Sequence, residues 1–71
     1  MSMRSYLVVI ERGERNFSAY VPDLPGCIAT GATRDETVER MREAIALHIQ
    51  GLHADGEAVP EPVTSAELVA A

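Results

Sequence analysis

Residues 21–27 read Val-Pro-Asp-Leu-Pro-Gly-Cys, a short stretch whose two prolines and one glycine restrict the backbone and decide how the chain turns here. Pro25-Gly26 suits the two central positions of a type II turn, because proline presets φ at about −65° and glycine accepts the positive φ that follows. Asp23 can accept hydrogen bonds from backbone N–H groups ahead of it and so hold the turn. The sequence therefore predicts a tight, exposed connection between two strands.

The residues before this loop predict two strands joined by a short turn. Residues 16–21 alternate between apolar and polar side chains, the period-2 pattern of a half-buried strand. Residues 5–11 are apolar on both faces, which indicates a strand central enough to be covered on one side and in contact on the other. The polar turn at residues 12–15 is short enough for the two strands to form an antiparallel hairpin.

The residues after the loop predict a third short strand and one long helix. Residues 27–33 are mostly small, and Gly31 among them indicates a bulge or the close approach of another backbone. Thr33 and Glu36 match a capping box at a helix start. The helix is expected from about residue 34 to about residue 53, with an apolar stripe that can cover the sheet. The stripe consists of Val38, Met41, Ile45, His48, Ile49 and Leu52.

The C-terminal residues leave two structures open. Gly56 is the expected helix stop. Residues 59–62 (Val-Pro-Glu-Pro) must be extended, because each proline lacks a donor and restricts the residue before it. Residues 64–67 (Thr-Ser-Ala-Glu) match a second capping box and so permit a helical turn. The alternative is a strand over residues 67–70.

The order of these motifs resembles the N-terminal domain of HicB-type antitoxins, over residues 5–70. The resemblance rests on the apolar run at 6–11, the segment from Phe17 to Cys27, Thr-Gly-Ala-Thr at 30–33, and Asp-Gly-Glu-Ala-Val-Pro-Glu-Pro at 55–62. It implies a fourth strand at residues 67–70 beside the first three, in the order β-β-β-α-β. We therefore expect an α+β fold: a three-stranded antiparallel meander, one helix packed on one face and a fourth strand, in a single HicB-like domain spanning residues 1–71.

The resemblance also implies a function. Antitoxins of this family dock on small, basic, mRNA-cleaving toxins of the HicA type and cover their catalytic surface. The expected partner is therefore a HicA-like toxin. Family antitoxins often add a C-terminal DNA-binding segment; no basic helix or arm of that kind occurs in this sequence, so no separate DNA-binding domain is expected. The alternative is a self-associating structural or small-ligand-binding module without a toxin partner.

Size and charge narrow the classes of partner. The chain has 71 residues and a net charge of −5. Nucleic-acid binders normally carry an excess of basic residues, so we expect no direct nucleic-acid binding by this chain alone and a basic protein as partner. A core this small leaves little net stability, which predicts a homodimer or higher oligomer. No apolar run approaches the ~18 residues of a membrane span, and the N-terminus lacks a secretory signal, so a cytoplasmic protein is expected.

Groups that could perform catalysis do not converge in this sequence. His48 and His53 lack the i, i+4 spacing that places two imidazoles on one metal. Cys27 is expected to be a small apolar side chain rather than a nucleophile. We therefore expect no catalytic residue, no metal and no cofactor. The candidate partner-binding residues, which a rigid exposed loop would present to the toxin, are Asp23, Leu24, Pro25 and Gly26. Acidic side chains of the helix are expected as secondary contacts.

Overall fold

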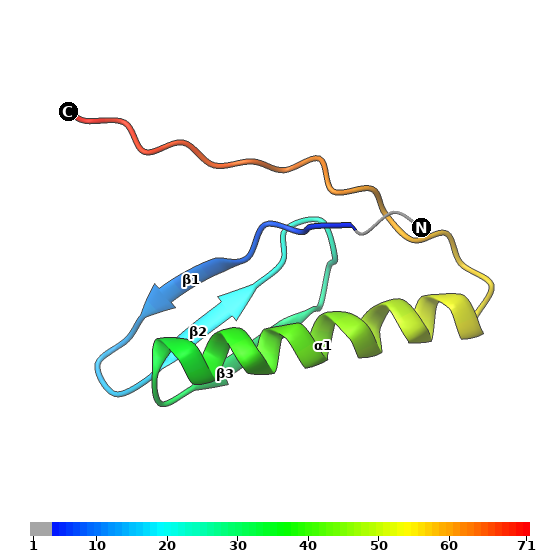
Figure 1. Cartoon of the computed structure of the whole chain (residues 1–71), viewed down its shortest axis with the longest axis horizontal. Coiled ribbons are helices and arrows are strands. Elements are labelled where there is room, and N and C mark those ends of the chain that lie inside the picture. The colour runs from blue at the N-terminus through cyan, green and yellow to red at the C-terminus, as the bar shows by residue number, and fades with distance from the viewer. Residues whose placement is uncertain (1–3) are drawn as a thin grey trace.

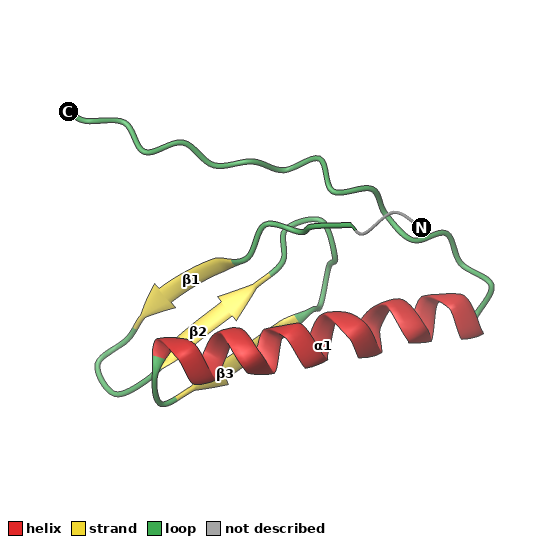
Figure 2. Cartoon of the chain, viewed as in Figure 1, coloured by secondary structure: helices red, strands yellow, loops and turns green. Residues whose placement is uncertain are grey.

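The computed structural model describes residues 4–71 and arranges three strands and one helix in two layers (Figure 1). The strands are β1 (Val9–Arg12), β2 (Phe17–Tyr20) and β3 (Ile28–Gly31), and the helix is α1 (Arg34–Ala54). The strands form one antiparallel sheet in the order β1-β2-β3, and α1 packs against β2 and β3 (Figure 2). The predicted α+β meander with one covering helix is confirmed.

The strand β1 is shorter than expected and lies at an edge of the sheet. Its pairing with β2 begins where Val9 faces Tyr20. The ladder cannot extend much further, because Pro22 follows Tyr20 by two residues and has no N–H to donate. The central strand is β2, so the expectation of a centrally placed first strand was wrong.

The buried core is small and lies between the sheet and α1. Its fully or almost fully buried hydrophobic residues are Ala19, Val21, Leu24, Cys27 and Met41. Met41 lies on the predicted apolar stripe of α1, and Ile45 and Leu52 from the same stripe are partly buried against this cluster. The predicted stripe therefore faces the sheet.

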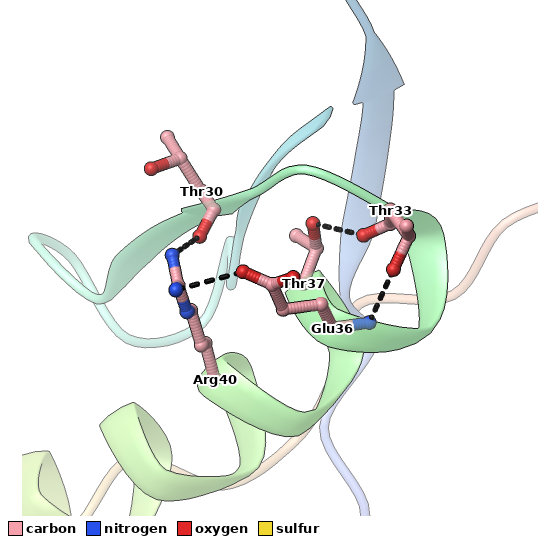
Figure 3. Close-up of polar contacts among 5 residues, drawn as sticks. All are labelled: Thr30, Thr33, Glu36, Thr37 and Arg40. Carbon is pink, nitrogen blue, oxygen red and sulfur yellow. Dashed lines mark hydrogen bonds and ion pairs between the residues drawn. The ribbon is translucent and has the colours of Figure 1, made fainter. Parts of the chain in front are cut away.

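Figure 3 shows how α1 begins. Thr33 is the N-cap, and its hydroxyl oxygen accepts a hydrogen bond from the Glu36 N–H at 3.1 Å. This is one half of the predicted capping box. The Glu36 carboxylate pairs instead with the Arg40 guanidinium at 2.7 Å. Arg40 also donates to the Thr30 carbonyl at 2.9 Å, which ties the first turns of α1 to β3.

Thr37 is fully buried where α1 lies close to β3, and no pattern in the sequence predicted a buried polar residue there. Its hydroxyl donates to the Thr33 carbonyl at 2.7 Å, so burial leaves that group paired. A Cβ atom on Gly31 would lie 2.6 Å from Thr37 Oγ1 and 2.9 Å from Thr37 N. The predicted close approach of another backbone at Gly31 is confirmed, and the absent side chain is what allows α1 to lie directly on β3.

The helix ends at the predicted place. Gly56 has a φ of 69° and donates its N–H to the His53 carbonyl at 3.1 Å. The Glu57 N–H donates to the Leu52 carbonyl at 2.9 Å, and together these two bonds form a Schellman motif. The chain leaves α1 in a fixed direction as a result.

The C-terminal tail (residues 57–71) runs extended and forms no strand or helix in the described structure (Figure 1). The predicted fourth strand over residues 67–70 is therefore not formed. The tail first contacts the residues before β1: the Tyr6 hydroxyl donates to the Pro60 carbonyl at 2.6 Å, and Arg4 pairs with Glu61 at 3.2 Å. Pro60 and Pro62 supply no N–H for a ladder, and a side chain takes the next two amides, as described below.

Candidate partner-binding site

The loop at residues 21–27 (the 21–27 loop) consists of two consecutive turns closed by a backbone hydrogen bond. The Leu24 N–H donates to the Val21 carbonyl at 3.1 Å, and the Cys27 N–H donates to the Leu24 carbonyl at 3.0 Å. The Val21 N–H closes the loop on the Cys27 carbonyl at 3.2 Å. Gly26 has a φ of 86°, as the third residue of a type II turn requires. The predicted turn is confirmed, and its hydrogen bonds make the loop rigid.

Leu24 points inward. Its side chain is 0% exposed and belongs to the core cluster with Met41. The expectation that the loop displays this side chain was wrong, because the two turns direct it under the loop rather than away from the molecule. Leu24 therefore supports the loop from within the core.

Asp23 is occupied by the chain's own tail. Its Oδ2 atom accepts hydrogen bonds from the N–H groups of Val63 at 3.2 Å and Thr64 at 3.0 Å. Its Oδ1 atom accepts the Thr64 hydroxyl at 2.7 Å. Asp23 was expected to bond to amides of its own turn; it bonds instead to residues 40 and 41 positions away. We call this set of contacts the Asp23 clamp.

The Asp23 clamp lowers the pKa of Asp23 below its usual value of 3.8, first through the Thr64 hydroxyl and then through the Thr64 and Val63 amides. The stabilisation of the docked tail is therefore fully present above pH 3.8 and is lost as the pH falls through the lower pKa of the docked state.

An Asp23→Asn variant is expected to release residues 63–71 at neutral pH, because an amide offers one acceptor oxygen in place of two. Hydrogen exchange of the Val63 and Thr64 amides, followed by NMR, measures the release. Thr64→Val removes only the hydroxyl contact and should release the tail partially. Full protection of both amides in Asp23→Asn would contradict the clamp.

Pro25 and Gly26 are the residues of the candidate set that remain exposed. A Cβ atom on Gly26 would meet nothing within 4 Å, so the tip of the 21–27 loop faces open space. Beside the loop, Tyr20 is 42% exposed and Ile28 is 69% exposed. These two residues are paired across β2 and β3 and alternate with the buried Ala19, which places them on the sheet face that α1 does not cover. The exposed loop tip thus continues into an apolar pair.

The acidic residues expected as secondary contacts, Asp35, Glu36, Glu39 and Glu43, belong to the N-terminal half of α1. Asp35 and Glu36 lie in its first turn, directly after β3, whereas the 21–27 loop precedes β3. Four residues of strand span about 13 Å. A partner that touches both the loop and this first turn must therefore extend along β3.

The described residues offer no assembled reaction centre. In the part of the chain from residue 4 onward, no group of three or more His, Cys, Asp or Glu side chains could hold a metal ion. Cys27 is buried, and burial raises the pKa of its thiol, which disfavours the reactive thiolate. His48 is half-buried and His53 is exposed, both late in α1. Within residues 4–71, no helix has the length and apolar character needed to cross a membrane.

Comparisons with known proteins give one family. Residues 6–71 match the family model described as "HicB_like antitoxin of bacterial toxin-antitoxin system". An uncharacterised 14.9 kDa protein from the rep-hol intergenic region of Haemophilus phage HP1 is 38% identical over 56 residues, which are 79% of this chain and 42% of that protein. A UPF0150 protein of Helicobacter pylori is 40% identical over 47 residues, which are 66% of this chain and 65% of that protein. The chain therefore spans less than two thirds of either relative.

The fold also matches a solved structure. A chain of a HicA3 and HicB3 toxin-antitoxin complex is similar with a TM-score of 0.72 and 32% sequence identity. The match covers 84% of this chain and 70% of that chain.

Proposed function

The chain belongs to the HicB-like antitoxins of bacterial toxin-antitoxin systems, and from this premise we propose that it binds and neutralises a small, basic, HicA-like toxin in the cytoplasm. The observation that carries the proposal is the similarity to a chain of a HicA3 and HicB3 toxin-antitoxin complex. Neutralisation requires only that the antitoxin cover the toxin surface that meets RNA. This chain contributes no chemical step to it.

The negative net charge of this chain supports a basic protein as its partner. The net charge of −5 attracts a protein that must itself bind a polyanion, and such attraction raises the rate of encounter. Asp35 and Glu43 enter no ion pair within 4.0 Å among the described residues, so both carboxylates are available to a partner's cations. The complex should therefore weaken as salt concentration rises.

The 21–27 loop is the proposed edge of the interface. Its hydrogen bonds already fix the backbone, so binding costs little conformational entropy there. A standard interface covers about 800 Å² on each partner, more than one loop tip can supply. The neighbouring apolar pair Tyr20 and Ile28 adds area, and tyrosine is enriched among the residues that dominate binding energy. We therefore place Pro25 and Gly26 at the rim and Tyr20 and Ile28 nearer the centre.

A Gly26→Asn variant tests this placement. Asparagine tolerates a positive φ and would meet open space in the free protein, so the fold should remain intact while the added side chain obstructs a partner. We expect toxin affinity to fall by roughly tenfold or more, measured by calorimetry with a purified HicA-like toxin, and inhibition of RNA cleavage to weaken in parallel.

Gly56→Asn is the matched control, because Gly56 also has a positive φ and open space but lies at the end of α1. It should bind the toxin as the unaltered protein does. Equal affinity of both variants would remove the 21–27 loop from the interface. Failure of the unaltered chain to inhibit a HicA-like toxin of any origin, including the product of a neighbouring gene, would overturn neutralisation itself.

A further inference from the structure

A groove of about 340 Å³ opens between the residues that precede β1 and the helix α1. It exists because α1 packs on β2 and β3 and leaves the β1 side of the sheet less covered. Its apolar wall comprises Val8, Val38, Met41 and Ile45, and Arg4 and Arg42 flank it. The volume is at the lower end of the range for small-ligand pockets, about 300–1,000 Å³, which suits one or two aliphatic side chains.

The apolar wall of the groove and the two arginines beside it indicate which kind of segment can bind there. The apolar wall favours an aliphatic side chain, and the two guanidinium groups favour an acid beside it. Among the described residues, each arginine forms an exposed ion pair: Arg4 with Glu61 at 3.2 Å and Arg42 with Glu39 at 3.4 Å. Such pairs contribute little and exchange readily. The arginines also make this groove a poor site for a basic protein.

The C-terminal tail carries the complementary chemistry. Leu68 is 100% exposed and Val69 is 80% exposed, directly after the acidic Glu67. We propose that Leu68 and Val69 of one molecule insert into the groove of a second copy of the chain, with Glu67 beside Arg42 of that copy, and that two copies exchange tails reciprocally to form a closed dimer. In such a dimer both grooves are filled, and Leu68 and Val69 of both copies are buried. This proposal is independent of toxin binding.

The geometry of the tail favours a second copy over the tail's own groove. The tail passes Arg4 at Glu61 and is then held at Thr64 by the Asp23 clamp. Leu68 lies four residues further on, about 13 Å of extended chain beyond the clamp. A return to the same molecule's groove would require a reversal within residues 65–67 (Ser-Ala-Glu), which contain no glycine or proline. Figure 1 shows the tail continuing away from α1 to its end.

Exchanging the charges of residues 42 and 67 tests the contact, with sedimentation equilibrium of the 71-residue chain as the measurement. The unaltered protein should dimerise reversibly at micromolar to hundred-micromolar concentrations. Arg42→Glu and Glu67→Arg should each weaken the dimer by roughly five- to tenfold, because each places like charges together across the contact. The double variant Arg42→Glu/Glu67→Arg should return most of the lost affinity. Arg42 and Glu67 are both exposed, so neither change threatens the fold.

A hydrophobic variant provides the second measurement. Leu68→Asp should weaken the dimer by roughly 10- to 100-fold. The control is Leu47→Asp, also an exposed leucine, on α1 and outside the groove, which should leave the dimer unchanged. A monomeric unaltered protein over this concentration range, or a double charge variant no better than either single variant, would overturn the proposal. Unchanged dimerisation in all these variants would also overturn the proposal, because the dimer would then form without the tail in the groove.

Discussion

Gly31→Ala is expected to destabilise the fold by about 2–3 kcal/mol, although it adds a single methyl group to an end of the sheet. The new Cβ would lie 2.6 Å from Thr37 Oγ1, 2.9 Å from Thr37 N and 3.1 Å from Thr37 Cα. Two of these atoms belong to the backbone of α1, so the helix itself must move to relieve the overlap. Movement of α1 would disturb the Thr37 hydroxyl bond to the Thr33 carbonyl, leaving a polar group buried without its partner.

Gly51→Ala is the matched control for this experiment. Gly51 lies within α1, and a Cβ there would meet nothing within 4 Å. Alanine has a higher helix propensity than glycine, so this variant should gain about 0.5–1 kcal/mol. Urea unfolding followed by circular dichroism gives both free energies of unfolding. If Gly31→Ala were as stable as the unaltered protein, the close approach of α1 to β3 would be wrong.

Leu24→Ala is expected to lower the free energy of unfolding by about 3 kcal/mol. Its side chain is 0% exposed and packs beneath the 21–27 loop, where the backbone is held by its own hydrogen bonds and cannot collapse readily into the space left. For a domain with so small a core, a loss of this size leaves much of the population unfolded. Toxin binding would fall too, but only through the loss of folded protein.

Leu47→Ala is the matched control, because it makes the same substitution at an exposed leucine. Leu47 is 67% exposed on α1, so the same substitution there should change the free energy of unfolding by no more than about 0.5 kcal/mol. Thermal unfolding of the two variants, together with toxin affinity measured well below the midpoint of Leu24→Ala, distinguishes the two roles of Leu24. Unaltered stability with lost toxin binding in Leu24→Ala would show that Leu24 contacts the partner after all.

The parts of the fold that the sequence predicted correctly are those fixed by neighbouring residues. Gly26 requires a positive φ because Pro25 precedes it in a type II turn. At the end of α1, the Gly56 N–H donates to the carbonyl three residues back and the Glu57 N–H to the carbonyl five residues back. Thr33 caps α1 by accepting the N–H of a residue three positions on. Each of these interactions lies within about one turn of chain, where composition and spacing determine the backbone.

The parts that were wrong or missed depend on residues distant in the sequence. No spacing rule connects Asp23 to Thr64, because the two lie 41 residues apart and meet only after α1 has reversed the chain. The direction of Leu24 depends on how both turns of the loop sit on Met41. In the candidate site, the exposure of Pro25 and Gly26 was therefore predictable, whereas the inward side chain of Leu24 and the use of Asp23 by the tail were not.

The Asp23 clamp also has a consequence for the order in which the chain folds. The three strands and α1 each contact an element adjacent in sequence, a topology that favours rapid folding. Among residues 4–71, the side-chain hydrogen bonds that join residues 40 or more positions apart all belong to the C-terminal tail, at separations of 40, 41, 54 and 57 residues. Closing those long loops costs entropy that the body of the domain does not incur. We therefore expect the tail to dock last and detach first, and its release to leave the strands and α1 intact.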